Sequence, residues 1–223
     1  MNEVWSKVIS CSDAIIERLS HTGVESTGIN DARFPWKDRL YSSHIYRRAH
    51  LNIVDARDSH KLWMMHCTIF PHLHDSSPIF GLDIIAGPTR ISGAFHDFSK
   101  TGNPNHSMMH WFDQRVVDLN WKKERELPDW AKQIFSPAMV AIGAVDNLDE
   151  IDQLIEVVLT NLDYYLENVG STQDDLFGYI DEQNRYCYYQ KQNPHNPRVM
   201  QSLGLSEEDA KSFVEEIMFP EIR

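Results

Sequence analysis

The feature that most constrains the fold is a run of strand-like segments between Tyr41 and Ser99 with no helix-length segment among them. Each segment is short, rich in Ile, Val, Phe, Trp and Tyr, and bounded by turn residues, a composition typical of β-strands. The segments are YSSHIYRRAHLNIVDAR, KLWMMHCTIF, IFGLDIIAG and RISGAFHDFS. Because parallel neighbours require a long crossover, usually a helix, the run predicts successive antiparallel strands and disfavours a doubly wound parallel sheet.

Helical patterns precede and follow this run. Apolar residues recur at helical spacing in MNEVWSKVISCSDAIIERLS, which lacks the basic head and apolar core of a signal peptide. The polar stretch SHTGVESTGINDARFPWKD that follows is typical of a loop. A broad apolar stripe then runs through LDEIDQLIEVVLTNLDYYLENVG and ends at Gly170, which predicts a long amphipathic helix.

Two further helices are expected towards the C-terminus. DDLFGYIDEQNRYCYYQKQ has a helical pattern that must end near Pro194 and Pro197, because proline breaks the hydrogen-bond ladder. Ser206 is placed to cap SEEDAKSFVEEIMF, whose first turn is acidic. Strands followed by helices predict one α+β domain over residues 1–223, with helices packed on an antiparallel sheet.

Net charge and cysteine content exclude several classes of function. The 223 residues carry a formal net charge of −12, whereas a nucleic-acid-binding surface is basic. The three cysteines are scattered, without metal-ligand or redox spacing, which indicates a reducing, cytoplasmic setting. No apolar run approaches the ~18 residues of a membrane span, so no membrane partner is expected.

Polar side chains interrupt three neighbouring strand segments where an apolar core is expected. His50 and Asn52 are two residues apart and therefore face the same side of a sheet. His66 and Asp83 would join them if their strands are adjacent. Each alone could be a satisfied core or edge residue, but burying an unpaired charge is costly. We therefore interpret the four as one site, in which Asp83 faces a ligand cavity and has its pKa raised towards neutrality, so that it can donate a proton.

The histidine-rich segment HCTIFPHLHDSSP allows a competing interpretation. His66, His72 and His74 could bind zinc, although His-x-His is a weak signal and no nearby glutamate could act as the general base of a zinc protease. Pro71 and the Ser-Ser-Pro sequence are typical of an exposed loop. The glycine patterns of the Walker, Rossmann and nucleophile-elbow motifs are absent, so the sequence gives no sign of a bound flavin or nicotinamide.

Four stretches, in order along the chain, resemble a known family. They are AHLNIV, MMHCTIFP, FGLDIIAGPTRISGAFHDFS and RELPDW. In these stretches the chain resembles the ferredoxin-dependent bilin reductases, and in particular their phycocyanobilin-forming members, over most of its length. The resemblance implies a three-layer α/β/α sandwich with a central antiparallel sheet and a bilin between the sheet and the C-terminal helices. It also implies biliverdin as substrate, reduced 2Fe-2S ferredoxin as external electron donor, and no bound cofactor or metal.

The resemblance assigns roles to the polar strand residues. Asp83 matches the central aspartate of the family, which contacts the pyrrole nitrogens and donates protons, so a protonated bilin would be the partner of its charge. His66 matches the histidine that shares a proton network with that aspartate. His50 matches a second histidine behind it. The resemblance thus explains an acidic residue in the middle of an apolar strand.

The resemblance also implies propionate-binding residues. Arg125, in RELPDW, matches an arginine that holds a propionate, in keeping with the bidentate fork of a guanidinium. From the residues alone, Arg125 would be a solvated charge at a helix start. Ser92 matches a serine that supports a propionate. In QNPHNPRVM, where relatives carry an asparagine or aspartate near the substrate, the candidates are Asn193, His195 and Asn196.

Asn52 departs from the family pattern. Phycocyanobilin-forming relatives carry a glutamate at this position, tied to protonation of the D-ring vinyl group, and an amide has no carboxyl proton to donate. The expected reaction is therefore a four-electron reduction of biliverdin to phycoerythrobilin through 15,16-dihydrobiliverdin, with Asp83 protonating the bridge and His66 as a second donor. The alternatives are phycocyanobilin:ferredoxin oxidoreductase activity and a non-catalytic bilin carrier on the same fold.

Ferredoxin is acidic, and so is this chain, so docking requires a local basic face. The candidates are Lys122, Lys123, Arg125, Arg47, Arg48, Arg185, Lys191 and Arg198. No heptad seam appears in the sequence. Together with the resemblance, this predicts a monomer in the cytoplasm of a cyanobacterial or phage-infected cell.

Overall fold

The computed structural model describes residues 2–26, 33–34, 36–103, 105–171 and 178–223, and its strands form one antiparallel sheet. Each strand pairs with the next along the chain, in the order β1 to β7. The strands are β1 (Val24–Glu25), β2 (Lys37–Ser42), β3 (Arg48–Ala56), β4 (Leu62–Phe70), β5 (Ile79–Ala86), β6 (Ile91–Ser99) and β7 (Val140–Val145). The antiparallel sheet predicted from the run between Tyr41 and Ser99 is confirmed.

Most helices precede or follow the strands. They are α1 (Glu3–Thr22), α2 (Arg57–His60), α3 (Ser107–Val116), α4 (Leu148–Asn168), α5 (Ile180–Gln190), α6 (His195–Ser202) and α7 (Glu207–Ser212), with a 3₁₀ turn at Ala131–Gln133 and a π-helix at Phe213–Met218. The side chains of Asn2, Asn147 and Ser206 cap α1, α4 and α7 by accepting a hydrogen bond from a first-turn N–H. None of the helices that the structure describes combines the length and apolar composition needed to cross a bilayer.

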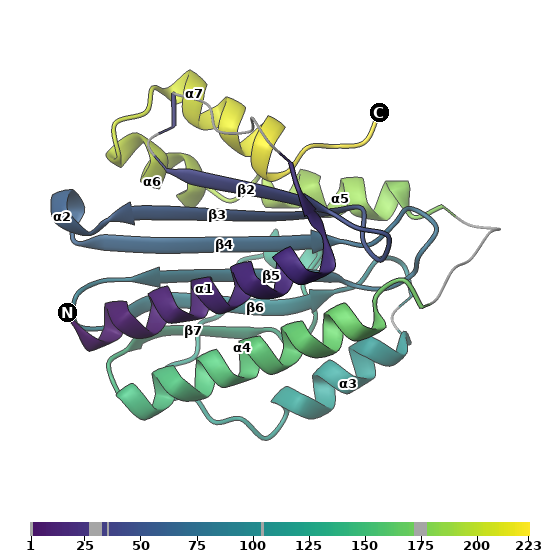
Figure 1. Cartoon of the computed structure of the whole chain (residues 1–223), viewed down its shortest axis with the longest axis horizontal. Helices are drawn as coiled ribbons and strands as arrows, with labels where there is room; N and C mark the ends of the chain where they lie inside the picture. Colours follow the sequence, from purple (N-terminus) through teal and green to yellow (C-terminus); the bar gives the residue numbers. More distant parts are fainter. Residues whose placement is uncertain (1, 27–32, 35, 104, 172–177) are drawn as a thin grey trace.

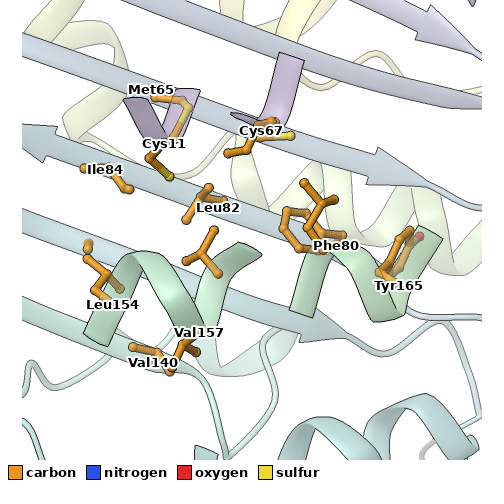
Figure 2. Packing of buried hydrophobic residues seen from close by; sticks show 14 of the residues in the cluster. Cys11, Met65, Cys67, Phe80, Leu82, Ile84, Val140, Leu154, Val157 and Tyr165 are labelled. Carbon is orange, nitrogen blue, oxygen red and sulfur yellow. The ribbon is translucent and has the colours of Figure 1, made fainter. Parts of the chain in front are cut away.

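One face of the sheet is apolar and packs against α1 and α4, which lie across the front of the sheet in Figure 1. Figure 2 shows this core, where Leu82 and Ile84 of β5 lie among side chains that include Leu154 and Val157 of α4. The stripe predicted in α4 is the face that is buried, because its apolar residues recur once per turn.

The opposite face of the sheet packs against the C-terminal helices. Phe213, at the start of the π-helix, lies against Phe34 and Trp36, with ring centroids 4.8 and 4.9 Å away. Tyr186 of α5 meets Phe70 of β4 edge-on. Apolar cores on both faces make the three-layer α/β/α sandwich, and the predicted fold is confirmed.

Some elements have no counterpart among those predicted. β2, β7 and α3 lie in segments without a clear alternating or helical stripe, and β1 falls inside the predicted loop. Residues 27–32 and 35 of that loop lie outside the described residues. So do residues 174–177, the start of the helix predicted in DDLFGYIDEQNRYCYYQKQ. The rest of that helix is α5, which ends at Gln190 as the prolines require.

One expectation about a polar segment was wrong. The Ser-Ser-Pro region is not an exposed loop, because Asp75, Ser76 and Ser77 are buried. The Asp75 carboxylate accepts hydrogen bonds from Ser77 and from the backbone N–H of Gly170, which ties the segment to the end of α4. Pro194 lies beyond the end of α5, as expected. It directly precedes α6, whose first turn tolerates proline.

Candidate active site

Three of the polar side chains form a row across the sheet. Asn52 of β3 pairs with His66 of β4, and His66 pairs with Asp83 of β5. Residues directly opposite each other in antiparallel strands point to the same face. His50, two residues before Asn52, shares this face and pairs with Thr68. The strands that carry the four predicted residues are therefore adjacent, and the row lies on the face covered by the C-terminal helices.

A buried carboxylate that was not among the predicted residues, Asp38 of β2, lies at one end of the row. It pairs with Asn52 and is 2% exposed. Its Oδ1 accepts hydrogen bonds from His50 Nε2 at 2.9 Å and from Asn52 Nδ2 at 3.0 Å. Burial lowers the pKa of His50 to about 4, against the opposing effect of Asp38. His50 is therefore a neutral imidazole at neutral pH, with its proton on the nitrogen that faces Asp38.

His66 occupies the centre of the row. Its Nε2 is 2.9 Å from Thr68 Oγ1, and Phe219, just after the π-helix, meets its ring edge-on with centroids 5.3 Å apart. The Nδ1 atoms of His50 and His66 are buried and have no hydrogen-bond partner among the described residues. Since an unpaired buried polar atom is costly, these nitrogens mark a place where a polar ligand would be stabilised.

Asp83 faces a small, partly open cavity of about 10 Å³ between the sheet and α5. The cavity is lined by His66, Gly81, Leu82, Asp83, Phe95, Asp97, Phe135, Met139, Tyr186 and Gln190. Burial raises the pKa of Asp83, and the nearby His66 opposes this less strongly. A carboxyl group with a raised pKa stays protonated nearer to neutral pH and can act as a general acid. The cavity is smaller than the ~300 to 1,000 Å³ of pockets for drug-sized ligands, so a larger ligand requires the wall opposite the sheet to move.

A second buried carboxylate, Asp97 of β6, lines the same cavity and was also missed as a site residue. It accepts hydrogen bonds from the Ser99 hydroxyl at 2.7 Å, from the Ser136 N–H at 3.0 Å and from the Ser136 hydroxyl. Ser136 lies between Phe135 and Met139, which form part of the cavity wall. Asp97 therefore anchors this wall to the sheet. Asp97 lies in FHDFS, one of the stretches that resemble the family, and this position could have identified it as a site residue.

Removal of the Asp97 carboxylate is expected to destabilise the fold in a pH-dependent way. Asp97→Ala leaves the Ser136 N–H and two hydroxyls without their acceptor, a loss of about 2 kcal/mol. Burial raises the pKa of Asp97 to about 6, so the folded state holds a proton that the unfolded chain releases above about pH 4. Asp97 therefore contributes its full stabilisation of the fold below about pH 4, and this stabilisation is lost as pH rises through about 6. Urea unfolding should therefore show a larger loss at about pH 5 than at about pH 8, and equal losses would contradict the assignment.

Arg125 lies beside the edge strand β7 and not at a helix start, which corrects the expectation drawn from the residues alone. Its backbone N–H donates to Ala141 O at 2.8 Å. Its Nη2 donates to Ser92 O at 2.6 Å, and its guanidinium carbon is 5.7 Å from the ring centroid of Phe95. Phe95 is the cross-strand partner of Asp83. The structure thus brings Arg125 to the face that carries Asp83, next to the Ser92 carbonyl, whereas the Ser92 hydroxyl donates to the carbonyl oxygen of Ile85 at 3.0 Å.

Two glycines make room for the Arg125 side chain. Gly93 and Gly143 are paired across β6 and β7. A Cβ built on Gly143 would lie 2.3 Å from Arg125 Nε, and one on Gly93 would lie 3.7 Å from the guanidinium carbon. The paired glycines therefore form a depression on the sheet in which Arg125 lies. An open groove along β7, lined in part by Arg125, Ala141 and Met139, adjoins the cavity at Met139.

The predicted C-terminal candidates are not at the cavity. Asn193 Oδ1 accepts a hydrogen bond from His195 N at 3.0 Å, and Asn193 Nδ2 is 3.4 Å from Asn196 Oδ1, so the three organise the start of α6. Among the described residues that line the cavity, this part of the chain contributes Tyr186 and Gln190, whose side chains are joined at 2.7 Å. Tyr186 and Gln190 are four residues apart on a predicted helix, so the sequence could have shown that they lie on one helix face.

Other predicted ligands and cations lie elsewhere. His72 Nε2 is 3.1 Å from the carbonyl oxygen of Ser43, and within the described ranges no three His, Cys, Asp or Glu residues are grouped as metal ligands. Arg47 and Arg48 are not solvated charges. Arg47 donates to Gln183 at 2.7 Å, and Arg48 donates to the carbonyl oxygen of Ile217 in the π-helix. The exposed members of the predicted basic set are Lys122, Lys123, Arg125, Arg185 and Arg198, whereas Lys191 is half-buried and paired with Glu221.

The profile of the ferredoxin-dependent bilin reductase family matches residues 4–220. The chain is 31% identical over 228 residues to a phycocyanobilin:ferredoxin oxidoreductase of Prochlorococcus marinus, covering 94% of this chain and 90% of that protein. It is 29% identical over 188 residues to the enzyme of the same name from Synechococcus sp. (strain CC9902), covering 82% and 74%.

Two solved structures are similar to the chain. A protein named PcyX is 31% identical, with a TM-score of 0.70 over 97% of this chain and 99% of that one. Phytochromobilin synthase from tomato, solved in complex with biliverdin, has a TM-score of 0.72 over 96% of this chain and 82% of that one. At 14% identity, the second match shows a shared fold and no more.

Proposed function

The chain belongs to the ferredoxin-dependent bilin reductase family, and on that premise we propose that it reduces biliverdin by four electrons to phycoerythrobilin through 15,16-dihydrobiliverdin. The observation that carries the proposal is the row across the sheet, in which a carboxyl group with a raised pKa faces the cavity while the position opposite His66 holds an amide. The row has one acidic donor, Asp83, and offers a neutral group where the phycocyanobilin-forming relatives are expected to carry an acid.

The electron and proton balance requires proton donors among these residues. Each two-electron reduction adds two electrons, delivered one at a time by reduced ferredoxin, and two protons delivered by protein groups. Asp83 is the donor for the bridge between rings C and D, because its carboxyl group is protonated nearer to neutral pH than an exposed aspartate. His66, beside it on β4, is the second donor, and His50 stands behind it.

Asn52 supports the choice of product. Its amide nitrogen donates to Asp38 and carries no acidic proton. The D-ring vinyl group therefore lacks the donor that its reduction requires, and reduction is directed to the bridge and the A ring.

Substrate binding follows from the same geometry. The tetrapyrrole lies between the row and the C-terminal helices, which must move outwards because the cavity of about 10 Å³ is too small for it. Arg125, supported by the Ser92 carbonyl, holds a propionate near the groove along β7. Asn193, His195 and Asn196 come near the substrate only if α6 takes part in that movement. Residues 1–223 act as one bilin reductase domain, a cytoplasmic monomer that docks ferredoxin through exposed basic residues.

Anaerobic turnover of biliverdin with reduced ferredoxin tests the proposal. The expected result is transient 15,16-dihydrobiliverdin followed by phycoerythrobilin, identified by absorbance and by chromatography against authentic bilins. Phycocyanobilin, with its D-ring vinyl group reduced and the bridge intact, would refute the assigned product. Binding of biliverdin without any spectral change after addition of reduced ferredoxin would indicate a carrier instead.

A further inference from the structure

Asp38 forms the base of the site without facing the cavity. It is paired with Asn52 across β2 and β3, and it is separated from His66 by the width of β3. A single oxygen of its carboxylate accepts both the His50 and the Asn52 hydrogen bonds. Asp38 therefore contacts two residues of the row but is placed behind them.

A carboxylate determines which way an asparagine amide points. An ionised carboxylate only accepts hydrogen bonds, whereas an amide has a donating NH₂ and an accepting oxygen at its two ends. With Asn52 Nδ2 held 3.0 Å from Asp38 Oδ1, the Asn52 carbonyl oxygen is directed away from β2. On the side of Asn52 opposite β2 lies its partner His66 on β4, and the face that both residues share is the one assigned to the substrate.

Arginine and histidine side chains surround Asp38 in the fold. Arg48 of β3 is half-buried, and its pKa is lowered to about 10 by burial and by the neighbouring Arg47, against a weak opposing effect of Asp38. The other titratable groups close to the network are His50, which is neutral at neutral pH, and His66. Because its hydrogen bonds to the row go to two neutral groups, His50 and Asn52, the effect of Asp38 on these residues is one of orientation.

We propose that Asp38 is a positioning residue that fixes Asn52 as a hydrogen-bond acceptor for an N–H group of the bound tetrapyrrole. This inference rests on the proposed function, since it needs biliverdin on the face of the row. It makes position 52 a substrate-binding position instead of a proton-donating one. It also explains why a carboxylate is buried one strand away from the amide.

A double-mutant cycle on biliverdin binding tests the inference without an electron donor. The variants are Asp38→Asn, Asn52→Ala and the two combined, with Asp55→Asn as the matched control on β3, where the carboxylate pairs with Arg57 at the surface. In Asp38→Asn the side chain keeps its size, but the new amide can donate as well as accept, so Asn52 is free to flip. Kd for biliverdin and the long-wavelength absorption band of the complex are measured for each.

Each single variant is expected to raise Kd about tenfold, the loss of one hydrogen bond. The double variant should be no worse than Asn52→Ala, and all three should shift the absorption band alike, which a purely structural role would not do. An unchanged Kd in Asp38→Asn, or effects that multiply to about a hundredfold, would overturn the inference.

A second variant keeps the test decisive if Asp38→Asn does not fold. Asn52→Gln leaves Asp38 intact and moves the amide by one methylene, so it should weaken binding to the same extent as Asn52→Ala, and unchanged binding would overturn the inference. If the parent chain binds and reduces biliverdin but the cycle is additive, only this inference fails. If the parent chain does not bind biliverdin, the proposed function fails with it.

Discussion

Asp83→Asn is expected to lower the rate of biliverdin reduction by at least about a hundredfold while leaving biliverdin bound. The amide fills the same space on β5 but has no carboxyl proton to transfer, and a positioned general acid contributes roughly 10² to 10⁴ in rate. Single-turnover absorbance changes after addition of reduced ferredoxin give the rate, and a titration without ferredoxin gives Kd.

Asp58→Asn, an exposed carboxylate changed in the same way, is the matched control and should react like the parent. The parent enzyme should also slow as pH rises through the raised pKa of Asp83, because only the protonated carboxyl donates. Parental turnover by Asp83→Asn would remove the basis for a reductase built around this residue.

Gly143→Ala is expected to raise Kd for biliverdin roughly 50-fold with little change in stability. The added methyl group would lie 2.3 Å from Arg125 Nε, so the arginine must leave its place beside Phe95 and lose its hydrogen bond to the Ser92 carbonyl. Once displaced, Arg125 no longer holds the propionate of biliverdin. A hydrogen bond to a charged group contributes about 1.5 to 3 kcal/mol, and its loss sets the size of the expected increase in Kd. Absorbance titration with biliverdin measures it.

Three comparisons make this result specific to Arg125. Gly87→Ala is the control, because a Cβ there has no neighbour nearer than 3.8 Å. Arg125→Ala should weaken binding as much as Gly143→Ala, and combining the two should add nothing. Biliverdin dimethyl ester, which has no carboxylates, should bind the parent and both variants equally. Full affinity for biliverdin in Gly143→Ala would show that the position of Arg125 does not matter.

The predictions that proved correct depend on local sequence patterns and on the pairing of neighbouring strands. His50, Asn52, His66 and Asp83 lie on strands with strong β-composition, and their joint placement needed only that neighbouring strands pair in order. The long amphipathic helix α4 was equally clear, because its period is local.

The residues that were missed depend on pairing that local patterns do not encode. Asp38 lies on a strand whose start follows a polar loop, so its register opposite Asn52 was not visible. Asp97 was part of a recognised motif, but its partner Ser136 is 39 residues further on. Arg125 was placed at a helix start because only the pairing of its backbone with Ala141 reveals an extended segment. These contacts are set by tertiary structure and not by propensity.

The pairing of each strand with its successor has a consequence for biosynthesis. Sheets built from sequence-adjacent hairpins close short loops and fold early. The strands that bear Asp38, Asn52, His66, Asp83 and Asp97 are complete once residue 99 has left the ribosome. The sheet that carries these side chains can thus assemble during translation, while the C-terminal helices that cover it are still being made.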